Sequence, residues 1–197
     1  ADTSTGSYNW GIRQFVDNTI QALGSGSITL WGRSGDSSTG SYNPGVEAVG
    51  HVIGHGGAIA ITGIAGSAPG ANNVGIAVLG TLQNSGTGTL TLTGTGGSHA
   101  GSTSSGNYGI AFSDATLETV DGTITLAGTG GSGGGSGNDG VRMPLPGING
   151  YSGANSIRTT GAGDLVLIGT AGPGGTGVVA STADMLKTTG SGAIRIT

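Results

Sequence analysis

Aliphatic residues recur along the chain as pairs separated by a single residue, and each pair follows a glycine-containing or similarly polar turn. An aliphatic residue at every second position predicts a β-strand with one buried face, because successive side chains of a strand point to opposite sides. No stretch shows the 3.6-residue period of a helix, and segments rich in glycine and threonine are poor helix formers. The six pairs, which we expect to form the buried core ladder, are Ile28/Leu30, Ile59/Ile61, Leu90/Leu92, Ile124/Leu126, Leu165/Leu167 and Ile194/Ile196.

These pairs belong to a longer unit that repeats along the whole chain. Each unit opens with a glycine and an aliphatic residue, as in Gly11-Ile12 and Gly45-Val46, and continues with a single aliphatic residue in a polar stretch. A turn and the alternating pair complete the unit. A repeat of about 33 residues is typical of solenoid proteins, in which each unit stacks on the next. The six units span approximately residues 11–44, 45–74, 75–108, 109–139, 140–176 and 177–197.

Three short strands per unit predict an all-β fold, a right-handed parallel β-helix (β-solenoid) of about six coils that forms one domain over residues 1–197. Each strand would pair with its equivalent in the next coil, and the inward positions would stack into aliphatic ladders. Charged residues one unit apart have opposite signs, as in Arg13 with Glu47 and Glu118 with Arg158. A sandwich of β-hairpins is the alternative fold, but it does not require the same three-strand order to recur.

Composition narrows the class of protein further. Glycine supplies 46 of the 197 residues, charged residues amount to 8%, and cysteine is absent. With a net charge of −4 and Lys187 as the one lysine, we expect no nucleic-acid partner. No run of 18 apolar residues occurs, so we expect no membrane insertion. The first residues lack the basic and apolar regions of a signal peptide, so we expect a mature chain or a piece of a longer one.

The unit that begins Gly109-Ile110-Ala111-Phe112 and ends in the glycine-rich run of residues 121–131 resembles repeats of large bacterial surface proteins. These are the filamentous-haemagglutinin-like and autotransporter-passenger proteins. The resemblance covers essentially the whole chain and rests on architecture and composition. It implies an extracellular or bacterial cell-surface location, secretion through the outer membrane, and a role as a stalk, fibre or adhesin. It carries over no functional residue, because these repeats have no catalytic motif.

The motifs that could support chemistry lack the structural context that they need. Residues 128–133 match a dinucleotide-binding pattern and residues 130–134 a nucleophile elbow, but no helix follows either of them. His51 and His55 would bind zinc together only on a helix, and no pair of carboxylates converges. We therefore expect no catalytic residue and no cofactor. Residues 134–141 match one copy of a calcium-binding nonapeptide, which makes Asp139 the candidate metal ligand, although a single copy favours a plain linker.

Three kinds of interaction surface are predicted. The third strand of the fifth unit is apolar on both faces, so we expect a loop or a laterally packed molecule to cover Val166 and Ile168. Neither end of the chain carries a readable cap, so we expect the rod to continue end to end, either covalently or through a second copy. A carbohydrate-binding or polysaccharide-processing β-helix module is the alternative function. In that case surface glycans would stack on Tyr8, Trp10, Trp31 or Tyr42, residues that could equally anchor loops.

Overall fold

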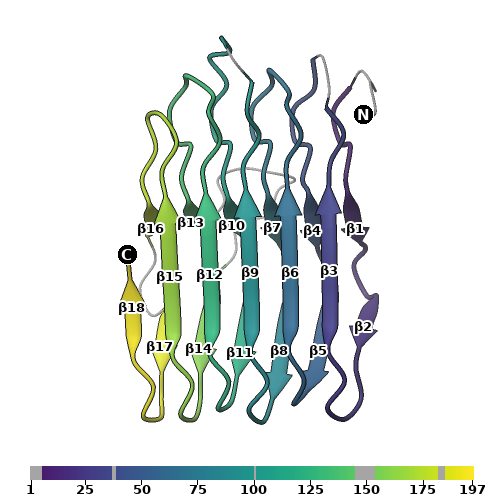
Figure 1. Ribbon diagram of the computed structural model, residues 1–197, viewed down its shortest axis with the longest axis vertical. Coiled ribbons are helices and arrows are strands. Elements are labelled where there is room, and N and C mark those ends of the chain that lie inside the picture. Colours follow the sequence, from purple (N-terminus) through teal and green to yellow (C-terminus); the bar gives the residue numbers. More distant parts are fainter. Residues whose placement is uncertain (1–5, 37–38, 100, 145–153, 182–184) are drawn as a thin grey trace.

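The computed structural model describes residues 6–36, 39–99, 101–144, 154–181 and 185–197 and shows a β-solenoid with three strands in each coil (Figure 1). The described residues form strands and turns and no helix. Every strand pairs in parallel with its equivalent in the neighbouring coil, so the all-β parallel solenoid expected from the repeat is confirmed. Each coil contributes one strand to each of three sheets, and each sheet has six strands.

The strands of the three sheets follow one another in the chain in a fixed order. The first sheet contains β1 (Ile12–Gln14), β4 (Val46–Ala48), β7 (Ile76–Val78), β10 (Ile110–Phe112), β13 (Val141–Met143) and β16 (Val178–Ala180). The second sheet contains β2 (Thr19–Gln21), β5 (His51–His55), β8 (Thr81–Ser85), β11 (Thr116–Thr119), β14 (Ser156–Thr159) and β17 (Leu186–Thr188). The third sheet contains β3 (Ile28–Arg33), β6 (Ile59–Ile64), β9 (Leu90–Thr95), β12 (Ile124–Thr129), β15 (Leu165–Thr170) and β18 (Ile194–Ile196).

The core is a set of aliphatic ladders that run along the axis of the solenoid. In the third sheet, Ile59 pairs with Leu90 and Leu90 with Ile124, in the register that the alternating pairs predict. The second members of the pairs stack in the same way, since Ile61 pairs with Leu92 and Leu126 pairs with Leu167. From the second coil to the fifth, both members of each pair are buried: Ile59, Ile61, Leu90, Leu92, Ile124, Leu126, Leu165 and Leu167.

The ladder is less protected at its two ends. In the first coil Ile28 is buried, but Leu30 is only partly buried, so the expected burial is incomplete there. The expectation of a buried ladder is wrong for the last coil, where Ile194 and Ile196 are 42% and 53% exposed. Their inward faces lack a following coil among the described residues.

A column of glycines lets the first and third sheets meet. The fifth residue of each long strand of the third sheet points inward and is a glycine in every case: Gly32, Gly63, Gly94, Gly128 and Gly169. A Cβ atom on Gly63 would overlap the carbonyl oxygen of Gly75, which lies just before β7. The aliphatic ladder therefore ends where the chain of the neighbouring sheet approaches too closely for any side chain.

An asparagine ladder closes the corner that precedes the first sheet. The backbone N–H of Asn43 donates to Oδ1 of Asn73 (3.1 Å), and the N–H of Asn73 donates to Oδ1 of Asn107 (3.0 Å). Asn9 and Asn138 extend the same pattern at the two ends, with distances of 2.9 and 3.1 Å. The residue before each of these asparagines has a positive φ, at Tyr8, Tyr42, Asn72, Gly106 and Gly137. The Oδ1 atoms of Asn43, Asn73, Asn107 and Asn138 thus each satisfy a backbone donor of the preceding coil, which regular strand pairing leaves unpaired at this bend.

Candidate functional site

Within the part of the chain that the structure describes, each end of the solenoid is an open strand edge. The strands β1, β2 and β3 each pair on one side only, and so do β16, β17 and β18. At the last coil, the exposed inward residues Ile194 and Ile196 present an apolar cross-section. At the first coil, the inward residues Ile12, Ile20 and Leu30 are only partly buried, and the exposed apolar side chains of this coil include those of Phe15, Val16 and Leu23. Unpaired edges with apolar side chains between them are suited to pairing with another coil.

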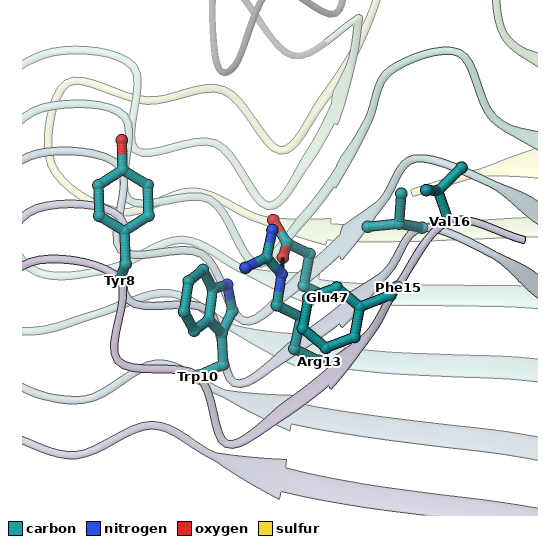
Figure 2. A pocket seen from close by; sticks show the side chains of 7 residues that line it. Tyr8, Trp10, Arg13, Phe15, Val16 and Glu47 are labelled. Carbon is teal, nitrogen blue, oxygen red and sulfur yellow. Dashed lines mark ion pairs between the residues drawn. The ribbon is translucent and has the colours of Figure 1, made fainter. Parts of the chain in front are cut away.

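A cluster of aromatic and charged side chains lies beside the first coil (Figure 2). Arg13 and Glu47 are paired in the first sheet, and Nε of Arg13 lies 2.8 Å from Oε2 of Glu47, so the opposite signs read from the sequence do meet. The guanidinium of Arg13 also lies 4.1 Å from the ring centroid of Trp10 and 4.7 Å from that of Phe15. The arginine is therefore held by two cation–π contacts and one ion pair.

Tyr42 completes this cluster from below the surface. Its hydroxyl donates to Oε1 of Glu47 at 2.6 Å, and both side chains are buried. Tyr42 is therefore an anchor of the chain, and the hypothesis that it offers a stacking face to a glycan is wrong. Its ring contacts that of Tyr8 edge to face, with centroids 5.7 Å apart. Tyr8 is exposed, and Trp10 is half-buried.

Trp31 is the more exposed of the two tryptophans and lines a second hollow on the surface. Its side chain is 61% exposed and lines a groove together with Trp10, Arg33 and Asp36. Nη2 of Arg33 lies 3.5 Å from Oδ1 of Asp36, and both side chains are open to solvent. An exposed indole beside a charged pair matches the chemistry of a sugar, since a ring face stacks on C–H groups while charged groups bind hydroxyls.

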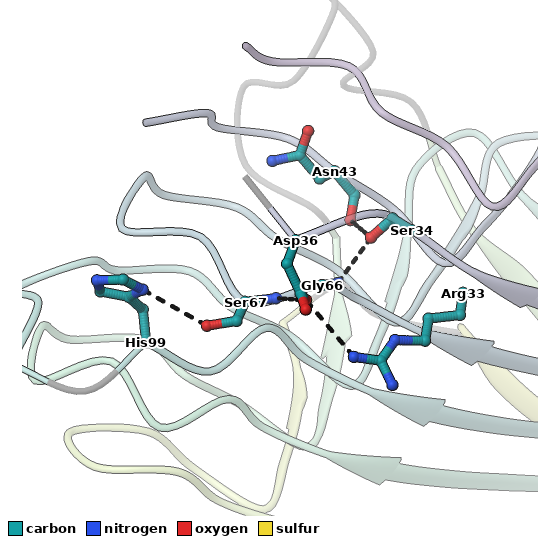
Figure 3. A network of polar contacts seen from close by, with 7 residues as sticks. All are labelled: Arg33, Ser34, Asp36, Asn43, Gly66, Ser67 and His99. Atoms are coloured by element: carbon teal, nitrogen blue, oxygen red, sulfur yellow. Dashed lines mark hydrogen bonds and ion pairs between the residues drawn. The ribbon is translucent and has the colours of Figure 1, made fainter. Parts of the chain in front are cut away.

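A polar network links three successive coils near this groove (Figure 3). Oδ1 of Asp36 accepts a hydrogen bond from the backbone N–H of Ser67 at 2.7 Å, and this bond is the main reason why the pKa of Asp36 is lowered. Oγ of Ser67 lies 3.4 Å from Nδ1 of His99. The carboxylate contacts the backbone of Ser67 and makes no contact with the imidazole, so these residues do not have the geometry of a catalytic triad. Their arrangement ties neighbouring loops together.

Ser34 plays a similar structural role one residue away from this network. Its hydroxyl donates to the carbonyl oxygen of Asn43 at 2.8 Å and accepts from the backbone N–H of Gly66 at 2.7 Å. Because Ser34 is buried, it satisfies two backbone groups that water cannot reach.

Asp139 is engaged with protein groups rather than poised for a cation. It is buried, its Oδ2 lies 3.0 Å from Nη1 of Arg142, and its Oδ1 accepts from the backbone N–H of Thr176 at 2.7 Å. An ion pair and a backbone donor thus occupy the carboxylate. Within the described residues, no group of three or more potential metal-ligating side chains is present. The residue is better described as a tie between the fifth and sixth coils than as a linker residue or a calcium ligand.

His51 and His55 lie on the strand β5, as expected, and both are exposed. A ring nitrogen of His55 lies 2.9 Å from Nε2 of Gln21 in the first coil. The second ion pair expected between coils is also present, because Nη2 of Arg158 lies 2.6 Å from Oε2 of Glu118. These contacts add a polar layer to the outside of the second sheet.

The outward side of β3, β6, β9, β12 and β15 carries mostly small residues, and we call it the threonine face. It has three columns that run along the axis: Thr29, Ala60, Thr91, Thr125 and Val166; Trp31, Thr62, Thr93, Ala127 and Ile168; and Arg33, Ile64, Thr95, Thr129 and Thr170. Arg195 of β18 continues the first column beyond Val166. Val166 is half-buried and Ile168 is 43% exposed. No loop of the described residues covers Ile168, so the prediction of a covering loop is wrong for this part of the chain. Cover by a laterally packed molecule stays a prediction.

The asparagine ladder is the main structural feature that the pattern of apolar positions does not predict. Its signal is visible in the sequence, because asparagine stands two residues before the glycine that opens each of the first five units. The sixth unit has Gly175 in this position, and the ladder ends there. A polar residue that recurs with the same spacing as the core is as informative as an aliphatic one.

No family model, no curated protein and no solved structure matches this chain. The described residues contain no helix long and apolar enough to cross a membrane. The open ends, the aromatic groove and the threonine face are the features of the described residues that bear on function.

Proposed function

We propose that this chain is a non-enzymatic, structural segment of an extracellular or cell-surface fibre or adhesin stalk, in which solenoid coils stack end to end. The observation that carries the proposal is the open edge at each end of the three sheets. An unpaired strand edge is a template for further parallel pairing. The partner is a further coil, supplied by more repeats of the same chain or by a second copy.

The two end faces have matching chemistry. If β18 lay beside β3 of a following segment, Ile194 and Ile196 would continue the ladder onto Ile28 and Leu30. The same placement would bring β16 beside β1 and β17 beside β2, because the three sheets keep one strand order. Most of the inward residues brought together in this way are aliphatic, with Gln14 and Thr188 as polar exceptions, so the junction would bury largely the same kind of surface as the interior coils.

An end-face variant tests this proposal. Aspartate in place of both Ile194 and Ile196 would put two charges into the junction, and burying unpaired charges is strongly unfavourable. Ser191→Asp adds charge on an exposed turn of the same coil and serves as the control. We expect small-angle X-ray scattering to show particles that lengthen with concentration for the natural chain and the control, and single rods for the double variant. A stable compact monomer with both end coils exposed at every concentration would contradict the proposal.

A carbohydrate-binding module is the second candidate, and the groove at Trp31 favours it. The exposed indole, Arg33 and Asp36 supply a stacking face and charged hydrogen-bonding groups. A glycan array separates the two candidates. Binding that disappears in Trp31→Ala, while the rods keep their length, would assign this chain to glycan recognition on host or neighbouring cells. A polysaccharide-processing activity would additionally require cleavage of pectin-like polymers.

A further inference from the structure

The threonine face lies along the side of the rod, from the edge strand β3 to β15. In Figure 1 the strands β3, β6, β9, β12 and β15 stand in front, and no described segment crosses them. Its central column begins with Trp31 and ends with Ile168, which are 61% and 43% exposed. These two side chains lie four coils apart, or about 19 Å at the usual strand spacing. Between them lie only the small residues Thr62, Thr93 and Ala127.

The charges on this face place few restrictions on a partner. From β3 to β15 its three columns contain no carboxylate, and Arg33 at one corner is the one charged residue among them. Beyond Val166 the first column continues with Arg195 of β18, which is paired with Asp164 and has no counterpart in a face of five coils. Threonine and alanine offer methyl groups and hydroxyls that contact another flat surface without strong desolvation of charge. A partner with a similarly uncharged flat face would therefore fit, and the threonine face itself is such a surface.

We propose that a second copy of this chain packs its threonine face against this one, side by side, with the order of its coils reversed. The two-fold axis runs parallel to the strands and passes beside Thr93 of the third coil. A two-fold contact is self-complementary, so each contact occurs twice. Trp31 faces the partner's Ile168, and Thr62 faces the partner's Ala127. Thr93 faces its own equivalent.

The reversed order follows from the sizes of the side chains. With the coils in the same order, Trp31 would meet the partner's Trp31 and Ile168 would meet the partner's Ile168. Two indoles at one end and two isoleucines at the other would hold the sheets at unequal distances, and the small residues between them would not pack. The reversed order places one indole against one isoleucine at each end. It also places Arg33 opposite the partner's Thr170, so no like charges face each other.

The size of the contact predicts its strength. Five strands at about 4.8 Å and six residues at about 3.3 Å give a face of about 500 Å² per copy. Stable interfaces bury about 800 Å² per partner, so a single pair of chains forms a weak, reversible dimer. Longer rods multiply the contact along their length, which converts weak pairing into bundling. This contact does not depend on end-to-end stacking, since it leaves both end faces open.

Engineered cysteines test the arrangement, because the natural chain contains no cysteine. We expect Thr93→Cys to form disulfide-linked dimers rapidly under mild oxidation at high protein concentration. The third coil lies too far from either end for stacked rods to produce this product. Gln83→Cys, on the exposed outward side of β8 in the same coil, is the matched control and is expected to remain monomeric. Analytical ultracentrifugation of the natural chain and of Ile168→Arg measures the same association without cross-linking.

The order of the coils is tested by a second pair of variants. In the proposed arrangement, Thr62→Cys alone does not cross-link, whereas Thr62→Cys combined with Ala127→Cys in one chain does. Efficient cross-linking of Thr62→Cys alone would contradict the reversed order. If Thr93→Cys dimerises no faster than Gln83→Cys, the face does not self-associate and the proposal is wrong. Retention of a monomeric chain on an insoluble glycan, lost in Trp31→Ala, would assign the face to a carbohydrate instead and overturn the proposal.

Discussion

The third and sixth coils carry the same kind of residues in the same register, yet their interiors differ. In the third coil, Leu90 and Leu92 are fully buried, whereas in the sixth coil Ile194 and Ile196 are about half exposed. Strands of the third coil have a paired neighbour on both sides, and those of the sixth coil have one. In a solenoid, burial is thus supplied by the neighbouring coils rather than by the strand itself. An identical sequence pattern consequently contributes stability in proportion to the number of its stacked neighbours.

The largest expected effect is the difference between truncating a core residue in the third coil and truncating its equivalent in the sixth coil. Leu92→Ala removes a fully buried side chain and leaves a cavity, so we expect the free energy of unfolding to fall by about 2–5 kcal/mol. Ile196→Ala removes a half-exposed side chain, and we expect a loss below about 1 kcal/mol in the single rod. Denaturant titration followed by circular dichroism measures both. Equal losses at the two positions would contradict the comparison.

A second contrast concerns the asparagine ladder. Asn73 is fully buried, its Oδ1 accepts from Asn43, and its Nδ2 donates to the carbonyl oxygen of Gly70 at 2.7 Å. Asn73→Ala leaves these groups without partners, at a cost of about 1–3 kcal/mol for each buried group. Asn9 occupies the equivalent position in the first coil and is half-buried, so Asn9→Ala should cost less than about 1 kcal/mol. Thermal unfolding of both variants decides whether the ladder stabilises the interior more than the end.

The smallest expected effect is the contribution of Asp164 to the pH dependence of the melting temperature. Oδ1 of Asp164 accepts from the backbone N–H of Ala193, and this bond, with the side chain of Arg195, lowers the pKa of Asp164 below its ordinary 3.8. A carboxyl group with a lowered pKa stabilises the fold above pH 3.8, and this contribution is lost as the pH falls below that value. We expect the melting temperature of Asp164→Asn to depend less on pH between about 2 and 5 than that of the natural chain. Identical pH profiles would show that the tie between the last two coils contributes nothing.

The parts of the fold that could be predicted from the sequence are the strands in which every second residue points inward. The inward aliphatic residues and the pairing of Arg13 with Glu47 follow from the repeat alone. The burial of Tyr42 could not be read in this way, because it depends on a positive φ and on a hydrogen bond to a carboxylate five residues later. The exposure of Ile196 depends on what stacks beyond it, which a strand pattern does not contain. The tie made by Asp139 depends on a backbone donor 37 residues away.

The candidate site was harder to predict than the fold, for a related reason. Tyr8, Trp10 and Trp31 stand out in a chain with few aromatic residues, but their accessibility depends on how the corners of the coil turn. The threonine face was only partly visible from Val166 and Ile168. Its central column joins residues from five different coils, and their alignment requires the register of the whole third sheet.

Amide hydrogen exchange measured at several protein concentrations tests the central claim, that coils are stabilised by their stacked neighbours and that the end coils accept further coils. At low concentration we expect slow exchange in β6, β9 and β12 and fast exchange in β3 and β18. As the concentration rises, the protection of β3 and β18 should increase together toward that of the central strands, while β9 stays unchanged. Fast exchange in β3 and β18 at every concentration, in particles that keep the length of one chain, would contradict the account.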